Sequence, residues 1–346
     1  MEWSIVRKYF GCLSTFSAEN NQSEKTNIVL PCSYSADSKL HIYNFEEIKT
    51  ATKNFSHDSF ISEDKFGKNY AGAVHGTVRV LFKVFNLGVI NQVSEQEWLE
   101  DVTYFGHLRH RHLVTLIGYC CKDKHRILVY DDADLMCPLG PNLYHDSVPL
   151  AWTNKLKIAR GVAKGLAGLL GTDKPSISID CINTSNILID MKCKSKIMHF
   201  KHSMDGRGGT LKTDTEGENL VTDVLFRYGV ILLEILTGLP SKISDQNRSN
   251  SRENLIEWHG RKLKSPQDII DVMDKKLESQ YSKASARLAA SLAYNCLGQD
   301  RRERHTMDSV LEDMKLLKEY DSVLSGDNYT HSGHHGGIKT QKIRRK

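Results

Sequence analysis

The stretch SISIDCINTSNILID, residues 176–190, decides how this chain is interpreted. Its polar part carries Asp180 and Asn186, and it ends in an apolar run at 187–189. Before it, short β-type runs such as VRVLFKVF (78–85) occur, and after residue 150 the pattern becomes helical. We therefore expect an α+β, bilobal chain, with a small β-rich N-lobe, a larger helical C-lobe and a cleft between them.

The composition is that of a globular protein. Of the 346 residues, 40% are hydrophobic and 26% are charged, and the net charge is a mild +5. The dense basic run is confined to 339–346, so we expect no nucleic-acid partner. No apolar run approaches the ~20 residues of a membrane span, and the N-terminus lacks the apolar centre of a signal peptide. The 8 cysteines are scattered, which indicates reduced thiols in a cytosolic protein.

Apolar stripes locate the main helices. We expect an amphipathic helix at 44–55, and a buried central helix at VILLEILTG (230–238), which is apolar all round. A further stripe at 97–110 consists of Trp98, Val102, Phe105 and Leu108. Residues 1–40 and 319–346 have the polar composition of flexible tails. The domain prediction is one domain over 41–318, with an N-lobe at about 56–130 and a C-lobe at about 131–318.

Several blocks of this chain resemble plant receptor-like cytoplasmic kinases, in the family's order and at near-family spacing. They cover roughly residues 40–318 and are FEEIKTATKNFS (45–56), LRHRHLVTLIGYCC (108–121), RILVYDD (126–132), TSNILID (184–190), GVILLEILTG (229–238), NLIEWHGRKL (254–263) and DVMDKKLESQYSKASARLAASLAYNCLGQDRRER (271–304). The resemblance implies a protein kinase fold, and it implies ATP and magnesium as the cofactors of an active member.

The residues at the family's nucleotide site are altered. In active members a glycine-rich turn lays its backbone over the ATP phosphates. In the matching stretch ISEDKFGKNY (61–70), Ser62 and Asp64 replace the first two glycines and only Gly67 remains. A carboxylate at Asp64 would repel the phosphates. Asn69 and Leu81 match the adenine roof, and leucine adds carbon atoms where the purine would lie. A filled, vestigial nucleotide site is therefore expected.

Lys83 matches the strand lysine that holds the α/β-phosphates in active members and pairs with a glutamate of the next helix. By spacing, Asp101 takes the place of that glutamate. The expectation is a Lys83–Asp101 ion pair, and the alternative is a lysine whose charge reaches solvent.

The metal-binding residues are also changed. His199, in KIMHFKHS (196–203), stands where the family has its magnesium-binding aspartate. An imidazole is a poor ligand for hard magnesium, so we expect a partly buried structural histidine and no metal site. Asn186 remains as the family's second metal ligand and offers one neutral oxygen.

The catalytic loop can be aligned in two ways. Counted back from Asn186, Cys181 matches the catalytic aspartate and no base is present. Counted forward from GLAGLLGTDKP (165–175), Asp180 matches it, with one residue inserted before Asn186. Both alignments place Asn183 on the loop lysine and lose the loop arginine. A base misplaced by one ångström can already cost about a hundredfold in rate. Both alternatives stay open at this point.

No proline occurs between Pro175 and Pro240, so the A-P-E that anchors the family's activation segment is absent, and the span from Phe200 to Asp223 is shorter than in the family. The leading interpretation is a catalytically impaired, pseudokinase signalling or scaffold protein of plant receptor-kinase pathways that needs no cofactor. One alternative is a weak or atypical Ser/Thr kinase that uses Lys83, Asp180 and Asn186 with ATP and magnesium. Another is the product of a decayed or mis-joined kinase gene.

Partners and location follow from the resemblance. It implies receptor-like kinases or other signalling proteins as partners, and the cytoplasm as the location. The N-terminus suggests peripheral attachment to the plasma membrane through palmitoylation of Cys12. Cys12 lies close to Arg7, Lys8 and the aromatic residues Trp3, Tyr9 and Phe10. The sequence does not indicate the oligomeric state of the protein.

Overall fold

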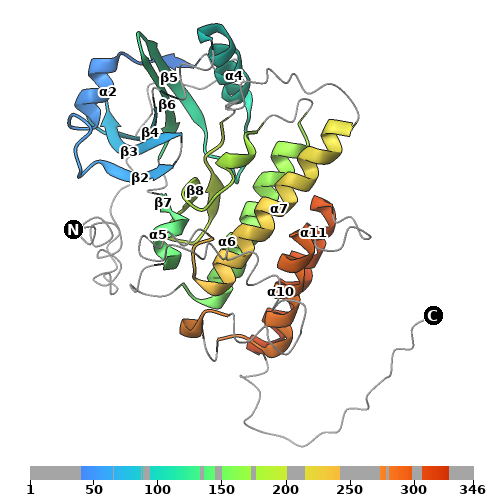
Figure 1. Cartoon of the computed structure of the whole chain (residues 1–346). Helices are drawn as coiled ribbons and strands as arrows, with labels where there is room; N and C mark the ends of the chain where they lie inside the picture. Colours follow the sequence, from blue (N-terminus) through green and yellow to red (C-terminus); the bar gives the residue numbers. More distant parts are fainter. Residues whose placement is uncertain are drawn as a thin grey trace, which may run out of the picture.

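The computed structural model describes residues 40–326, except for positions 65, 87, 89–93, 133–135, 145–149, 173–176, 201–214, 242–272, 278–279 and 298–305. Within this part the chain forms a sheet-rich N-lobe and a helical C-lobe (Figure 1). The α+β, bilobal architecture predicted from the sequence is confirmed. The predicted tail before residue 40, Cys12 and residues 201–214 of the activation segment lie outside the described residues.

The N-lobe is built on a six-stranded sheet in the order β1-β5-β6-β4-β3-β2. β1 pairs in parallel with β5, and the other neighbouring strands are antiparallel. Because β1 belongs to this sheet, the N-lobe begins near residue 41, earlier than the predicted residue 56. The strands are β1 (His41–Ile42), β2 (Phe60–Asp64), β3 (Gly67–Val74), β4 (Val78–Phe85), β5 (Leu116–Lys122) and β6 (His125–Asp131).

Alternation along β4 decides which side chains face the C-lobe, because successive side chains of a strand point to opposite faces. Val80 and Phe82 belong to an apolar cluster that also contains Ile48 of α2 (Phe45–Ala51). Leu81 and Phe85 belong to a different cluster, which includes residues of the C-lobe. Lys83 has the same parity as these two residues, so the strand carries its amine to the cleft side.

The helix α2 is shorter than the predicted span of 44–55. It ends at Ala51, and Lys53, Asn54 and Phe55 follow with φ values of 51°, 59° and 53°. Left-handed backbone is unfavourable for lysine and phenylalanine, whereas asparagine tolerates it. It brings the Phe55 ring to 5.8 Å from Phe45, so aromatic packing offsets part of that cost.

The helix α4 (Glu95–His107) covers the cleft side of the sheet. It begins with a capping box, in which the side chains of Ser94 and Glu97 each accept a hydrogen bond from the other residue's backbone N–H. Trp98, Val102 and Phe105 are buried, which confirms the predicted apolar stripe. The stripe anchors α4 and leaves its opposite face to solvent.

The C-lobe is helical around one large apolar core. The central helix α7 is buried over its second half, as predicted, and packs against α6 and α10 (Figure 1). The last helix continues to Gly326, so the predicted domain end at 318 falls inside it. The helices are α5 (Leu139–Tyr144), α6 (Trp152–Leu170), α7 (Thr215–Thr237), α10 (Lys283–Cys296) and α11 (Met307–Gly326), with 3-10 turns at Ile179–Cys181 and Lys275–Leu277.

A small sheet lies between the lobes, with the strand order β7-β8-β9. Its strands are β7 (Cys137–Pro138), β8 (Ile187–Ile189) and β9 (Ser195–Ile197). Leu188 of β8 joins the apolar cluster of Leu81, so one cluster spans both lobes and fixes the cleft between them. Within the part of the chain that the structure describes, no helix is long and apolar enough to cross a membrane.

Candidate functional site

The turn between β2 and β3 folds into the cleft. Phe66 is fully buried, and its ring lies edge-to-face with Phe200 at 5.2 Å. Gly67 follows with φ 155°, and a Cβ at this position would overlap the carbonyl oxygen of Val84. Glycine is therefore required where β3 approaches β4 closely. This retained glycine supports a turn whose phenylalanine fills the space beneath the sheet.

The carboxylate of Asp64, in the same turn, lies at the centre of the cleft. Its Oδ1 accepts hydrogen bonds from Lys83 Nζ at 2.6 Å and from the backbone N–H groups of Phe66 and Gly67 at 3.0 and 3.1 Å. Its Oδ2 accepts from Asn186 Nδ2 at 2.8 Å. A lysine, an amide and two consecutive backbone N–H groups are the kind of donors that bind a phosphate group. Here they surround a carboxylate of the chain itself.

The side chain of Lys83 is fully buried, with 0% of its surface exposed, and the side chain of Asp64 is only 7% exposed. Burial lowers the pKa of Lys83 from its usual value, and the neighbouring Asp64 charge acts in the opposite direction. The expected alternative of a lysine whose charge reaches solvent is therefore wrong. The predicted ion pair with Asp101, on α4, stays a prediction. Asp64 binds Lys83 Nζ, and the sequence did not suggest this partner.

Asn186 connects this cluster to the catalytic-loop segment. Its Nδ2 donates to the Cys181 backbone carbonyl at 3.1 Å as well as to Asp64. Its Oδ1 is buried and has no hydrogen-bond partner among the described residues. Cys181 precedes Asn186 by five positions and is fully buried, and its thiol approaches the Phe200 carbonyl oxygen at 3.4 Å. This geometry favours the alignment that counts back from Asn186.

Asp180 points away from this cluster. Its Oδ1 accepts from Arg227 Nη2 of α7 at 2.7 Å, and both side chains are about one-third exposed, at 38% and 33%. Because the carboxylate is paired with a guanidinium, it is oriented by α7. The residue that the alternative alignment would use as a base therefore contacts the C-lobe helix.

His199 is more deeply buried than predicted, at 1% exposure, and its ring lies 5.3 Å from Phe105. Neither ring nitrogen has a well-aligned hydrogen bond to a described residue. Burial lowers the pKa of His199 to about 4, so the imidazole is neutral at physiological pH. These features describe a packing residue, in agreement with the structural role that the sequence suggested.

Apolar side chains fill the rest of the cleft. Leu81, Met136, Leu188 and Phe200 have 1–2% exposure and belong to the cluster that spans both lobes. Asn69 and Ser62, which face each other across β2 and β3, are joined by a hydrogen bond of 2.9 Å from the amide to the hydroxyl.

ATP and magnesium, which the fold implies, do not fit this arrangement. The Asp64 carboxylate occupies the hydrogen-bond donors that phosphate oxygens would need. Its negative charge also repels the negative charge of the phosphates. Magnesium prefers several carboxylate and water oxygens. At the family's two metal positions the chain carries the neutral imidazole of His199 and the amide of Asn186, which is bound to Asp64.

Two contacts could not be found from the sequence. The sequence places Asp64 at a position that faces phosphates in the family. The residue spacing within the turn does not show that the carboxylate instead binds Lys83. Arg227 was not considered as a partner of Asp180, since the two residues lie 47 positions apart. The stretch DVLFRYG (223–229) has one residue more than the matching stretch of the family, and this difference was the only signal in the sequence near Arg227.

Comparison with known proteins first defines the class. A family model described as "Protein tyrosine and serine/threonine kinase" matches residues 55–220. The fold resembles the solved pseudokinase domain of BIR2, an immune regulator of the RLK/Pelle family, with a TM-score of 0.64 at 23% identity, covering 83% of this chain and 89% of that one. The apo GRMZM2G135359 pseudokinase gives a TM-score of 0.62 at 18% identity, covering 87% and 99%. The chain has a protein kinase fold.

Sequence relatives then define the family. One is the EPD1-interacting receptor-like cytoplasmic serine/threonine-protein kinase 5A of Gossypium barbadense, 36% identical over 326 residues, which cover 87% of this chain and 70% of the relative. Another is the probable serine/threonine-protein kinase PBL8 of Arabidopsis thaliana, 34% identical over 336 residues, which cover 91% and 80%. The chain belongs to the plant receptor-like cytoplasmic kinases.

Proposed function

We propose that this member of the family is a pseudokinase, which acts in receptor-kinase signalling through protein binding and does not transfer phosphoryl groups efficiently. The observation that carries the proposal is the Asp64 carboxylate, bound by Lys83 and Asn186 in the cleft. Receptor-like kinases or other signalling proteins are the proposed partners, and the cytoplasm, with peripheral attachment to the plasma membrane, is the proposed location.

Phosphoryl transfer depends on positioning and on charge neutralisation, because the enzyme contributes little covalent chemistry. In this cleft the charge of Lys83 is already neutralised by Asp64. Burial raises the pKa of the Cys181 thiol well above its usual value, so Cys181 cannot act as a base at neutral pH. The neutral, buried His199 supplies no charge for a metal ion. Each of these features removes a different requirement of the reaction.

The relatives support the proposal only in part. The curated relatives are named as kinases, and the two solved structures are titled pseudokinases at identities too low to carry function. A weak kinase that uses Asp180 as its base would have to break the ion pair with Arg227 first.

A phosphotransfer assay tests the proposal. The purified chain is incubated with labelled ATP, magnesium or manganese and a generic protein substrate, beside a Lys83→Met control. We expect equal, background labelling in both samples. We also expect no rise in melting temperature with millimolar ATP, although a nucleotide at a hundredfold excess over its Kd would stabilise the fold by about 2.7 kcal/mol. Transfer by the wild type that Lys83→Met abolishes would show that the chain is an enzyme.

A further inference from the structure

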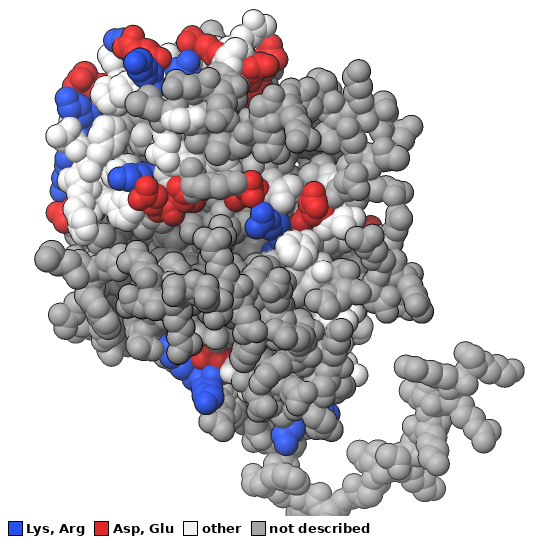
Figure 2. Space-filling view, viewed as in Figure 1, with Lys and Arg blue, Asp and Glu red and all other residues white. Residues whose placement is uncertain are grey.

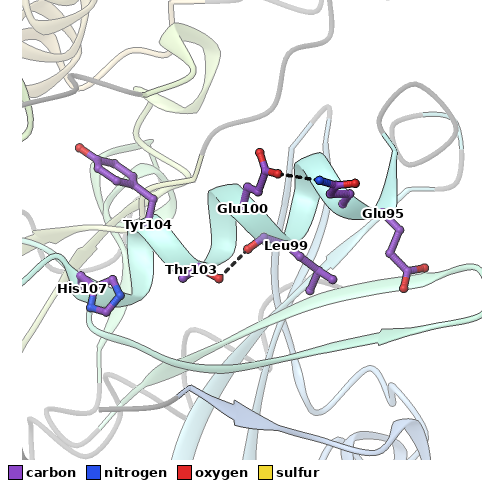
Figure 3. Close-up of a pocket in the computed structure, with 7 residues that line it drawn as sticks. Glu95, Leu99, Glu100, Thr103, Tyr104 and His107 are labelled. Atoms are coloured by element: carbon purple, nitrogen blue, oxygen red, sulfur yellow. Dashed lines mark hydrogen bonds between the residues drawn. The ribbon is translucent and has the colours of Figure 1, made fainter. Parts of the chain in front are cut away.

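The solvent-facing side of α4 lines one side of a wide, open groove of about 720 Å³, and the described residues that line it all belong to this helix. Seven residues line it: Glu95, Gln96, Leu99, Glu100, Thr103, Tyr104 and His107. Their spacing of three and four positions puts them in adjoining rows on one face of the helix. Figure 3 shows these side chains extending from the helix, with Leu99 on the same side of it as Glu95 and His107. This face points away from the buried stripe that anchors α4, and Leu99 and Tyr104 at its edges also pack against the cluster that contains the stripe.

The groove combines apolar and acidic groups. Leu99 and Tyr104 are partly exposed. Glu95 is engaged by Arg126 at 3.1 Å, whereas Glu100 accepts a hydrogen bond from the neutral amide of Gln96 at 3.1 Å and forms no salt bridge with a described residue. Acidic side chains gather at the end of the N-lobe where α4 lies (Figures 1 and 2). A segment with apolar side chains and an adjacent cation is the complementary ligand.

The start of the described chain lies at one end of this helix. Leu40 packs against Gly106 so closely that a Cβ on Gly106 would lie 2.6 Å from Leu40 Cδ1. Leu40, where the described chain begins, therefore lies beside the C-terminal end of α4, where Tyr104 and His107 line the groove.

The distance is easily bridged. The 13 residues of α4 extend over about 20 Å. Residues 11–39 form a connection whose root-mean-square span as a flexible chain is about 30 Å. The N-terminal residues can therefore reach any part of the groove without strain.

The N-terminus has the required chemistry. Residues 3–10, WSIVRKYF, contain the cations Arg7 and Lys8 together with apolar and aromatic side chains at Trp3, Ile5, Val6, Tyr9 and Phe10. We infer that residues 3–10 dock in the α4 groove of their own chain, with apolar side chains against Leu99 and Tyr104 and a cation at Glu100. The inference does not depend on whether the cleft binds ATP.

Site-specific photo-crosslinking tests the inference on the full chain. Benzoylphenylalanine replaces Thr103 in one sample and Gln96 in another, because both positions are exposed and line the groove. After illumination at low micromolar concentration, mass spectrometry identifies the crosslinked peptides. We expect crosslinks to residues 1–16 within the same chain, with a yield that does not change on dilution.

A charge reversal provides the matched comparison. Glu100→Lys should lower the crosslink yield about fivefold, the loss expected for one partly exposed ion pair turned repulsive. Glu312→Lys, an equal change at a 73%-exposed site on α11, should leave it unchanged. Crosslinks to residues 327–346, crosslinks to a second copy of the chain, or a lack of crosslinks to residues 1–16 would each overturn the inference. An undiminished yield in Glu100→Lys would remove the proposed charge contact.

Discussion

Replacing Asp64 with alanine tests whether the carboxylate is the structural centre of the cleft. The change removes the acceptor at 2.6 Å from the fully buried Lys83 Nζ and at 2.8 Å from Asn186 Nδ2. Breaking a buried ion pair by removing one partner costs about 3–5 kcal/mol, because a charge is left buried without compensation. We therefore expect Asp64→Ala to lower the free energy of unfolding by about that amount.

A double-mutant cycle separates the ion pair from other effects of the substitution. Lys83→Met fills the same space without a charge, so Asp64→Ala/Lys83→Met should be more stable than Asp64→Ala alone, by about 2 kcal/mol or more. Asp64→Asn is a second comparison: it keeps an acceptor for the two backbone N–H groups, but it removes the charge and places an amide NH2 against the Asn186 donor. Chemical denaturation followed by tryptophan fluorescence and circular dichroism gives the four free energies.

The outcome is decisive for the site. If Asp64→Ala costs less than about 1 kcal/mol, the value of an exposed pair, then Lys83 is not bound by Asp64 in solution and the cleft is open to other ligands. If adding Lys83→Met to Asp64→Ala brings no recovery, the cost of Asp64→Ala comes from the turn and not from the ion pair.

Three further predictions follow. The pKa of His199 is about 4 in the fold and 6.5 when unfolded, so the stability that its neutral form provides is lost as pH falls from about 6.5 to about 4. The free energy of unfolding of His199→Leu should therefore fall by about 3 kcal/mol less than that of the wild type over this pH range. An unchanged pH profile in this variant would contradict the assigned burial. Lys155 and Asp274 form a 2.7 Å pair inside the C-lobe, so Asp274→Ala should cost about 3–5 kcal/mol in denaturation, and a cost below 1 kcal/mol would show the pair to be solvated. The pair of Asp180 and Arg227, about one-third exposed, should contribute less than about 1 kcal/mol, so Arg227→Ala should leave the melting temperature nearly unchanged; a large drop in melting temperature would show that the Arg227 side chain is needed for packing.

The sequence by itself determined the fold and the family. The helical stripe of Trp98, Val102 and Phe105 and the apolar run 230–238 follow from periodic burial, which a single chain displays without any partner. The family blocks gave the positions of Lys83, Asn186 and His199 by alignment alone. The replacement of the family's magnesium-binding aspartate by His199 was also visible, because residue types are read directly.

Only the tertiary structure decided what the remaining groups do. Asp64 binds Lys83 and Asn186, which are 19 and 122 positions away in sequence, and Asp180 turns to Arg227, 47 positions away. Residue type gives a carboxylate its charge, but the direction of that carboxylate depends on how the strands and helices pack around it. The same holds for His199: its pKa is low because the ring is buried, and the ring lies against Phe105, which is far from it in the sequence. Contacts between segments that are distant in the sequence form only when the core is assembled, so no local sequence pattern predicts them.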